Sequence, residues 1–102
     1  MSKLTKLSLD VAKTLVHHFN SNSLEKNFKW KYGLFKNYEG LSKRGIYEIW
    51  GEGGKNPFLV IGQNYKGNTS IRKYCNKMED PLKKQIIDLL FQRYGSRVEL
   101  KD

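Results

Sequence analysis

The sequence has one cysteine, two prolines and no long apolar run. The single cysteine, Cys75, has no partner for an internal disulfide, which excludes a disulfide scaffold and favours a reducing compartment. No apolar stretch approaches the roughly 20 residues that a membrane-spanning helix needs. The first ten residues also lack the apolar segment of a signal peptide. We therefore expect a cytoplasmic protein without a membrane partner.

The composition is that of one small folded unit. The chain has 102 residues, of which 38% are hydrophobic and 13% aromatic, so a modest core can form and full disorder is excluded. No internal repeat, flexible linker or low-complexity block divides it. Residues 1–102 are predicted to form a single small basic domain.

Hydrophobic periodicity predicts an α+β fold. Ser8 is a candidate N-cap for a first helix, Asp80 and Pro81 are typical of the start of a second long helix, and Gly95 is typical of its end. The predicted elements are an N-terminal helix over 8–20, a three-stranded antiparallel meander over 27–35, 45–50 and 57–62, a short helix over 69–78, a long helix over 81–94 and a short C-terminal edge strand over 98–100.

The first predicted strand alternates aromatic and basic residues. Trp30 and Tyr32 alternate with Lys29 and Lys31 at the period of a strand that has one apolar and one basic face. Two interpretations follow. The aromatic side chains face the core and leave a lysine-lined surface, or they are exposed and stack on the bases of a nucleic acid.

The charge is strongly one-sided. Lys and Arg total 19 against 10 acidic residues, a formal net charge of +9. Such a surplus favours a polyanionic partner. Lysine outnumbers arginine 15 to 4, which argues against dense bidentate base recognition. The candidate binding residues are the clustered cations and the aromatic residues among them: Lys29, Lys31, Lys36, Tyr38, Lys43, Arg44, Trp50, Tyr65, Lys66, Arg72, Lys73 and Lys77.

Common catalytic and metal-binding motifs are absent from the sequence. The glycine-rich segment 51–56 fails the P-loop pattern and is predicted to be a turn between two strands. His17 and His18 are adjacent and point about 100° apart on a helix, which does not suit one metal ion. We predict no catalytic residue, no metal site and no cofactor.

One motif order is similar to that of a nuclease family. Gly45-Ile46-Tyr47 opens one strand and Val60-Ile61-Gly62 closes the next, an order that resembles the GIY-YIG nucleases. The resemblance implies a catalytic Tyr47 and a phosphate-stabilising Arg72 on a helix. The sequence departs from the pattern at Val60, where the family has its second tyrosine, and it has no counterpart of the helix that carries the metal-binding glutamate.

These features leave three hypotheses. The first is a non-enzymatic binding protein that associates with nucleic acid, RNA or DNA, or with a ribonucleoprotein, through a lysine-rich surface interleaved with aromatic residues. The second is an inhibitor or adaptor of the kind found in phages and mobile elements, which docks on a nucleic-acid-processing effector as anti-CRISPR proteins do. The third is a degenerate relative of the GIY-YIG nucleases. Both a monomer and a homodimer are compatible with the sequence.

Overall fold

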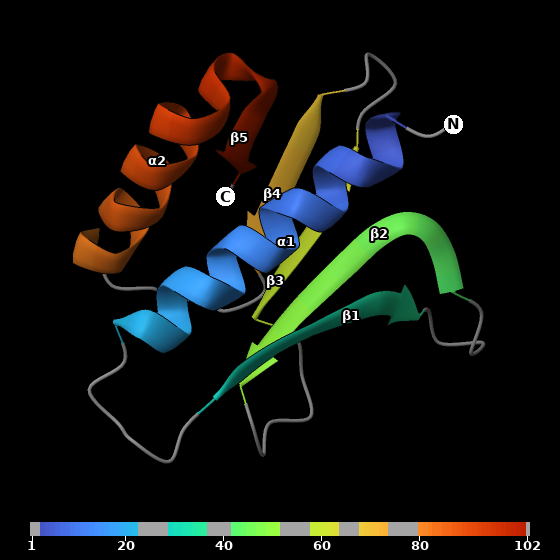
Figure 1. The fold of residues 1–102 in the computed structure, drawn as a ribbon, viewed down its shortest axis with the longest axis horizontal. Coiled ribbons are helices and arrows are strands. Elements are labelled where there is room, and N and C mark those ends of the chain that lie inside the picture. Colours follow the sequence, from blue (N-terminus) through green and yellow to red (C-terminus); the bar gives the residue numbers. More distant parts are fainter. Residues whose placement is uncertain are drawn as a thin grey trace.

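The described part of the chain folds into two α-helices and a five-stranded sheet (Figure 1). The computed structural model describes residues 3–22, 29–36, 42–51, 58–63, 68–73 and 80–101, of which 3–6, 36 and 42–44 are described by their backbone alone. The elements are α1 (Lys3–Ser21), β1 (Trp30–Lys36), β2 (Ser42–Gly51), β3 (Leu59–Gln63), β4 (Thr69–Lys73), α2 (Asp80–Tyr94), the 3-10 turn η1 (Gly95–Arg97) and β5 (Val98–Lys101). The predicted α+β class is confirmed.

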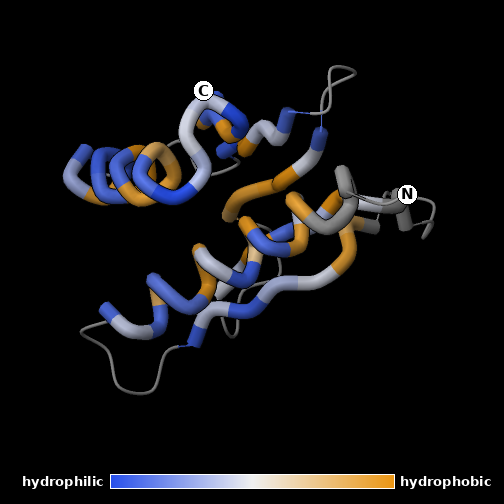
Figure 2. Tube along the Cα trace, turned by 45° about the horizontal axis from the view of Figure 1, so that its top comes forward, coloured by the Kyte–Doolittle hydropathy of each residue, from blue (hydrophilic) through white to orange (hydrophobic). Residues whose placement is uncertain are grey.

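α1 is an amphipathic helix with one buried apolar stripe, whose hydrophobic residues recur about once per turn in Figure 2. The buried members at spacing four are Leu7, Val11, Leu15 and Phe19. Because the stripe starts before Ser8, the helix also starts earlier and begins at Lys3. The prediction that Ser8 caps the helix is therefore wrong, and Ser8 lies inside α1 with no exposed surface.

The sheet contains a four-stranded antiparallel meander and a fifth, parallel strand. The strand order is β1-β2-β3-β4-β5, and β5 pairs parallel to β4. α2 connects these two strands, as a parallel pair requires a crossover. The three predicted strands of the meander correspond to β1, β2 and β3, with bounds shifted by a few residues. Residues 27 and 28 of the first predicted strand lie outside the described residues. The predicted C-terminal edge strand is confirmed as β5.

The short helix predicted over 69–78 is wrong where the structure describes this segment. Thr69–Lys73 is the strand β4, which pairs with β3 on one side and β5 on the other. Thr69 and Ile71 are fully buried, whereas Ser70 and Arg72 point to the other face. The sequence prediction depended on the helical spacing between Ile71 and apolar residues beyond position 73. The segment forms a strand because every second residue is buried and because it pairs with a strand on each side. Those later residues, 74–78, lie outside the described part.

α2 forms as the sequence predicts. It begins at Asp80 and ends at Tyr94, and Gly95 follows with a φ of +65°, a conformation that glycine adopts without strain. Ile86 and Leu90 are buried in the core. Among the described residues, no helix has the length and apolar character needed to cross a membrane.

Both helices pack on the same face of the sheet (Figures 1 and 2). Apolar residues of α1, α2 and the strands form one buried cluster between them. At the C-terminal end of α2, the hydroxyl of Tyr94 lies 2.6 Å from Asp10 Oδ2 and 2.8 Å from Thr14 Oγ1, both on α1. No helix of the described chain covers the opposite face, which we call the open face.

Candidate nucleic-acid interface

The open face is defined by strand register. Side chains that are paired across neighbouring strands point to the same side, and successive residues alternate. Tyr47, Ile61 and Ile71 are paired across the strands and are buried under the helices. The residues that alternate with them along each strand therefore point away from the helices. The open face comprises Lys31, Gly33, Ile46, Glu48, Trp50, Val60, Gly62, Ser70, Arg72, Glu99 and Lys101.

Trp50 is an aromatic side chain of this face. It pairs with Lys31 on β1, and the six-membered ring of its indole lies over Gly33. A Cβ at Gly33 would come within 3.1 Å of Trp50 Cη2, so the close approach depends on the missing side chain. The indole is partly exposed on a sheet face that no described helix covers.

Cations of three strands share the open face. Lys31 on β1, Arg72 on β4 and Lys101 on β5 are exposed, and Arg72 and Lys101 are direct partners in the parallel register. Two acids belong to the same face. Glu99 Oε1 lies 3.5 Å from Lys101 Nζ, and Glu48 is half-buried on β2. The described cations therefore exceed the acids on this face by a single charge.

The structure gathers some of the predicted binding residues and separates others. Lys31, Trp50 and Arg72 come together on the open face. Lys73 pairs with Leu59 and so belongs to the helix-covered face, because the strand period puts it opposite to Arg72. Lys29 is exposed next to β1. The remaining predicted residues are described by backbone alone or lie outside the described residues: Lys36, Tyr38, Lys43, Arg44, Tyr65, Lys66 and Lys77.

Lys101 is the cation that the sequence prediction missed. Its alternation with the inward residues Val98 and Leu100 is visible in the sequence and places it on the outward side of a strand. What the sequence does not reveal is that this strand pairs with β4 and brings Lys101 beside Arg72.

The aromatic residues of β1 lie on the side of the core, as the first of the two interpretations of the sequence predicts. The indole of Trp30 packs against Phe19 and Phe58, with ring centroids 5.1 and 5.0 Å apart. Tyr32 and Leu34 share this face but are 36% and 46% exposed, because β1 is an edge strand. These aromatic side chains are therefore on the side opposite to Lys31.

The residues implied by the GIY-YIG resemblance do not assemble into a site. Tyr47 is buried on the helix-covered face, whereas Arg72 is exposed on the open face. Arg72 also lies on a strand, where the resemblance implies a helix. Among the described residues, no group of three His, Cys, Asp or Glu side chains is placed to hold a metal ion.

The chain matches no protein-family model, no curated protein and no solved structure. Its class is therefore defined by architecture, an α+β domain with a five-stranded mixed sheet and two helices on one face.

Proposed function

We propose that the protein is a non-enzymatic nucleic-acid-binding protein that holds a single strand on the open face of its sheet. The observation that supports this proposal is the presence of Trp50 together with the cations Lys31 and Arg72 on a sheet face that no described helix covers. The net charge of +9 attracts a polyanion from a distance, and the open face supplies the contact.

The roles of these residues follow from their chemistry. Bases of single strands stack on aromatic side chains of exposed sheets, a contact that contributes about 1–3 kcal/mol per base. Trp50 is positioned to stack with a base. Lys31 lies on β1 and Arg72 on β4, and these two strands are three strand spacings or about 14 Å apart. A single strand of nucleic acid that crosses the sheet therefore contacts both residues with its phosphates. Glu48 and Glu99 repel phosphates and limit the affinity.

The affinity for labelled single-stranded RNA and DNA tests this proposal, measured by fluorescence anisotropy over a range of salt. Each lost phosphate contact lowers the slope of log K against log salt by about 0.7 for single strands. We expect the double variant Lys31→Ala/Arg72→Ala to lower the slope by about 1.4. The matched control is Lys13→Ala/Lys84→Ala, which removes the same charge from exposed positions on the helices. Trp50→Ala is expected to weaken binding at every salt concentration.

Two results contradict the proposal. Equal losses in the two double variants mean that only the net charge matters and that the open face has no role. No binding to either RNA or DNA at about 50 mM salt, where electrostatic contacts are strong, excludes it altogether.

A second candidate is the protein-docking inhibitor or adaptor. It is supported by Ile87 and Phe91, which are 43% and 71% exposed and lie four residues apart on one side of α2. Sedimentation of the wild type and of Phe91→Ser measures the oligomeric state and shows whether the protein associates with itself through this side of α2. A wild type that is itself a monomer, together with full nucleic-acid affinity in Phe91→Ser, leaves this side of α2 without a role in either activity.

A further inference from the structure

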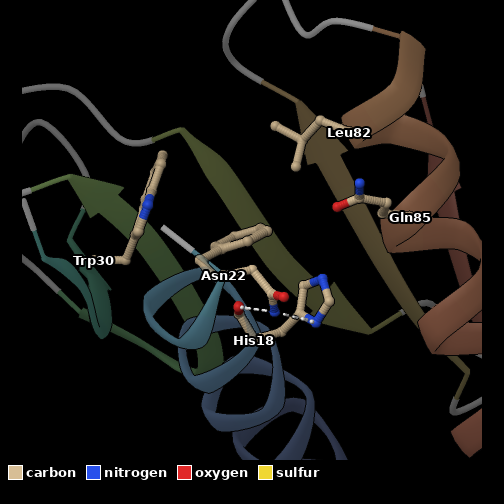
Figure 3. Close-up of a pocket in the computed structure, with 6 residues that line it drawn as sticks. His18, Asn22, Trp30, Leu82 and Gln85 are labelled. Carbon is tan, nitrogen blue, oxygen red and sulfur yellow. Dashed lines mark hydrogen bonds between the residues drawn. The ribbon is translucent and has the colours of Figure 1, made fainter. Parts of the chain in front are cut away.

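A pocket of about 210 Å³ lies between the two helices and the start of β1. Figure 3 shows His18 and Asn22 of α1, Trp30 of β1, and Leu82 and Gln85 of α2 around it. Because Trp30 belongs to the helix-covered face, this pocket is separate from the open face.

Two opposed walls shape the pocket for a flat molecule. Figure 3 shows the indole of Trp30 nearly edge-on, with one face turned toward Leu82 and Gln85. Phe19 and Phe58 hold the indole in place, since each has its ring centroid within about 5.1 Å of the indole centroid. A planar ring that enters between Trp30 and Leu82 contacts an aromatic face on one side and an aliphatic side chain on the other.

Hydrogen bonds fix the tautomer of His18 beside these walls. Asn22 Nδ2 lies 2.7 Å from the backbone oxygen of His18 and 3.3 Å from His18 Nδ1. The contact with the carbonyl oxygen identifies this atom as the amide nitrogen, so it donates to both groups and Nδ1 accepts. The ring proton of neutral His18 is therefore on Nε2. That atom is buried and has no hydrogen-bond partner in the described structure, although it points toward the side of Gln85 (Figure 3).

We propose that this pocket binds a nucleobase-type ring, a planar nitrogen heterocycle with in-plane hydrogen-bond acceptors. Its faces contact Trp30 and Leu82, and its edge pairs with the amide of Gln85, which offers a donor and an acceptor side by side. Gln85 is exposed, so its side chain has room to rotate. This rotation uncovers the Nε2–H of His18, which is then within reach of a ring acceptor. Pockets for drug-sized ligands measure about 300–1,000 Å³, so a pocket of about 210 Å³ suits a smaller ligand of one or two fused rings.

Tryptophan fluorescence tests this proposal with adenosine as the probe. Trp50→Phe leaves Trp30 as the sole tryptophan, whose emission reports stacking in the pocket. In this background we expect adenosine to quench the emission saturably. Gln85→Ala and His18→Phe should each weaken the binding about 5- to 10-fold, the loss expected for one hydrogen bond. The matched controls are Gln92→Ala and His17→Phe, which change exposed neighbours on the same helices and should leave the affinity unchanged.

A second pair of probes separates recognition of the ring nitrogen by hydrogen bonding from apolar contact alone. Benzimidazole has an in-plane acceptor nitrogen and indole of the same size has none, so we expect His18-dependent binding of benzimidazole and weaker binding of indole. Equal affinities for both rings, unchanged affinity of Gln85→Ala together with His18→Phe, or the absence of any binding would each overturn the proposal. Imidazole ¹⁵N shifts give a readout independent of affinity, because Nε2 must carry the proton in the free protein and shift on binding.

The source of the ring is decided by competition. If the ring belongs to a bound strand, adenosine displaces a short labelled oligoadenylate; if it is a free nucleoside, adenosine and the oligonucleotide bind together. Lys31→Ala/Arg72→Ala should leave adenosine affinity unchanged, so the pocket and the open face can each fail without the other.

Discussion

The hydroxyl of Tyr94 donates a 2.6 Å hydrogen bond to Asp10 Oδ2 and joins the last residue of α2 to α1 across 84 positions of sequence. The same oxygen lies 2.8 Å from Thr14 Oγ1. Since the tyrosine has one proton and gives it to the carboxylate, Thr14 is the donor of the second bond. This pair of bonds holds the C-terminal end of α2 against α1.

Removing the hydroxyl of Tyr94 should therefore loosen α2. We expect Tyr94→Phe to lower the free energy of unfolding by about 1–2 kcal/mol, because two hydrogen bonds are lost and one is to a charged group. For a domain of this size each kcal/mol lowers the melting temperature by about 4–8 °C. Urea unfolding and thermal melts measure both. The control is Arg93→Gln, whose 3.8 Å contact with Asp10 joins two half-exposed groups and contributes less. Equal effects of the two variants would contradict this account.

The same contact predicts a loss of stability in alkali. Burial, and then the hydrogen bond to Asp10, raise the pKa of Tyr94 above its ordinary value. A raised pKa in the folded protein means that the protonated hydroxyl stabilises the fold fully below the unfolded pKa of about 10. This stabilisation decreases as the pH rises from there and is lost through the raised pKa of the folded state. Urea midpoints measured between about pH 9 and pH 11 should fall more steeply for the wild type than for Tyr94→Phe. Parallel curves would show that Tyr94 makes no such contribution.

The position of Ser8 reverses the expected effect of Ser8→Ala on the free energy of unfolding. An N-cap serine stabilises a helix, and its replacement by alanine costs about 1 kcal/mol. Ser8 instead lies inside α1, fully buried, and its Oγ has no hydrogen-bond partner in the described structure. Ser8→Ala should therefore raise the free energy of unfolding by about 1 kcal/mol, because a desolvated hydroxyl is removed and alanine favours the helix. Chemical denaturation measures this change, with the exposed Ser21→Ala as the control. A destabilised Ser8→Ala protein would restore the capping interpretation.

Gly33 and Gly62 form a matched pair on the open face. A methyl group at Gly33 meets Trp50 Cη2 at 3.1 Å, whereas one at Gly62 meets Ile46 Cγ1 at an ordinary 3.7 Å. Gly33→Ala should move the indole and shift its N–H cross-peak in an NMR spectrum. Gly62→Ala should leave that peak in place and stabilise the strand by about 0.5 kcal/mol through the loss of glycine's conformational freedom. An unmoved Trp50 cross-peak in Gly33→Ala would mean that the indole does not rest on this position.

Local patterns in the sequence were sufficient for much of the fold. The apolar stripe of α1, the Asp80-Pro81 start and Gly95 end of α2, and the alternation in β1 depend on neighbours within a few residues, so they can be read from the chain directly. The segment Thr69–Lys73 was misassigned because its spacing fits both a helix and a strand, and its two partner strands are distant in the sequence.

The sequence by itself determined the excess of positive charge, the α+β class and the residues that alternate along β1, β2 and β3. The tertiary structure alone decided which alternating sets share a face: Arg72 joins Lys31, Trp50 and Lys101, while Lys73 turns to the other side. It also decided that His18, Trp30 and Gln85 line one pocket. The physical reason is that the face of a strand residue depends on register, and a pocket on packing between elements, and both are set by partners far along the chain.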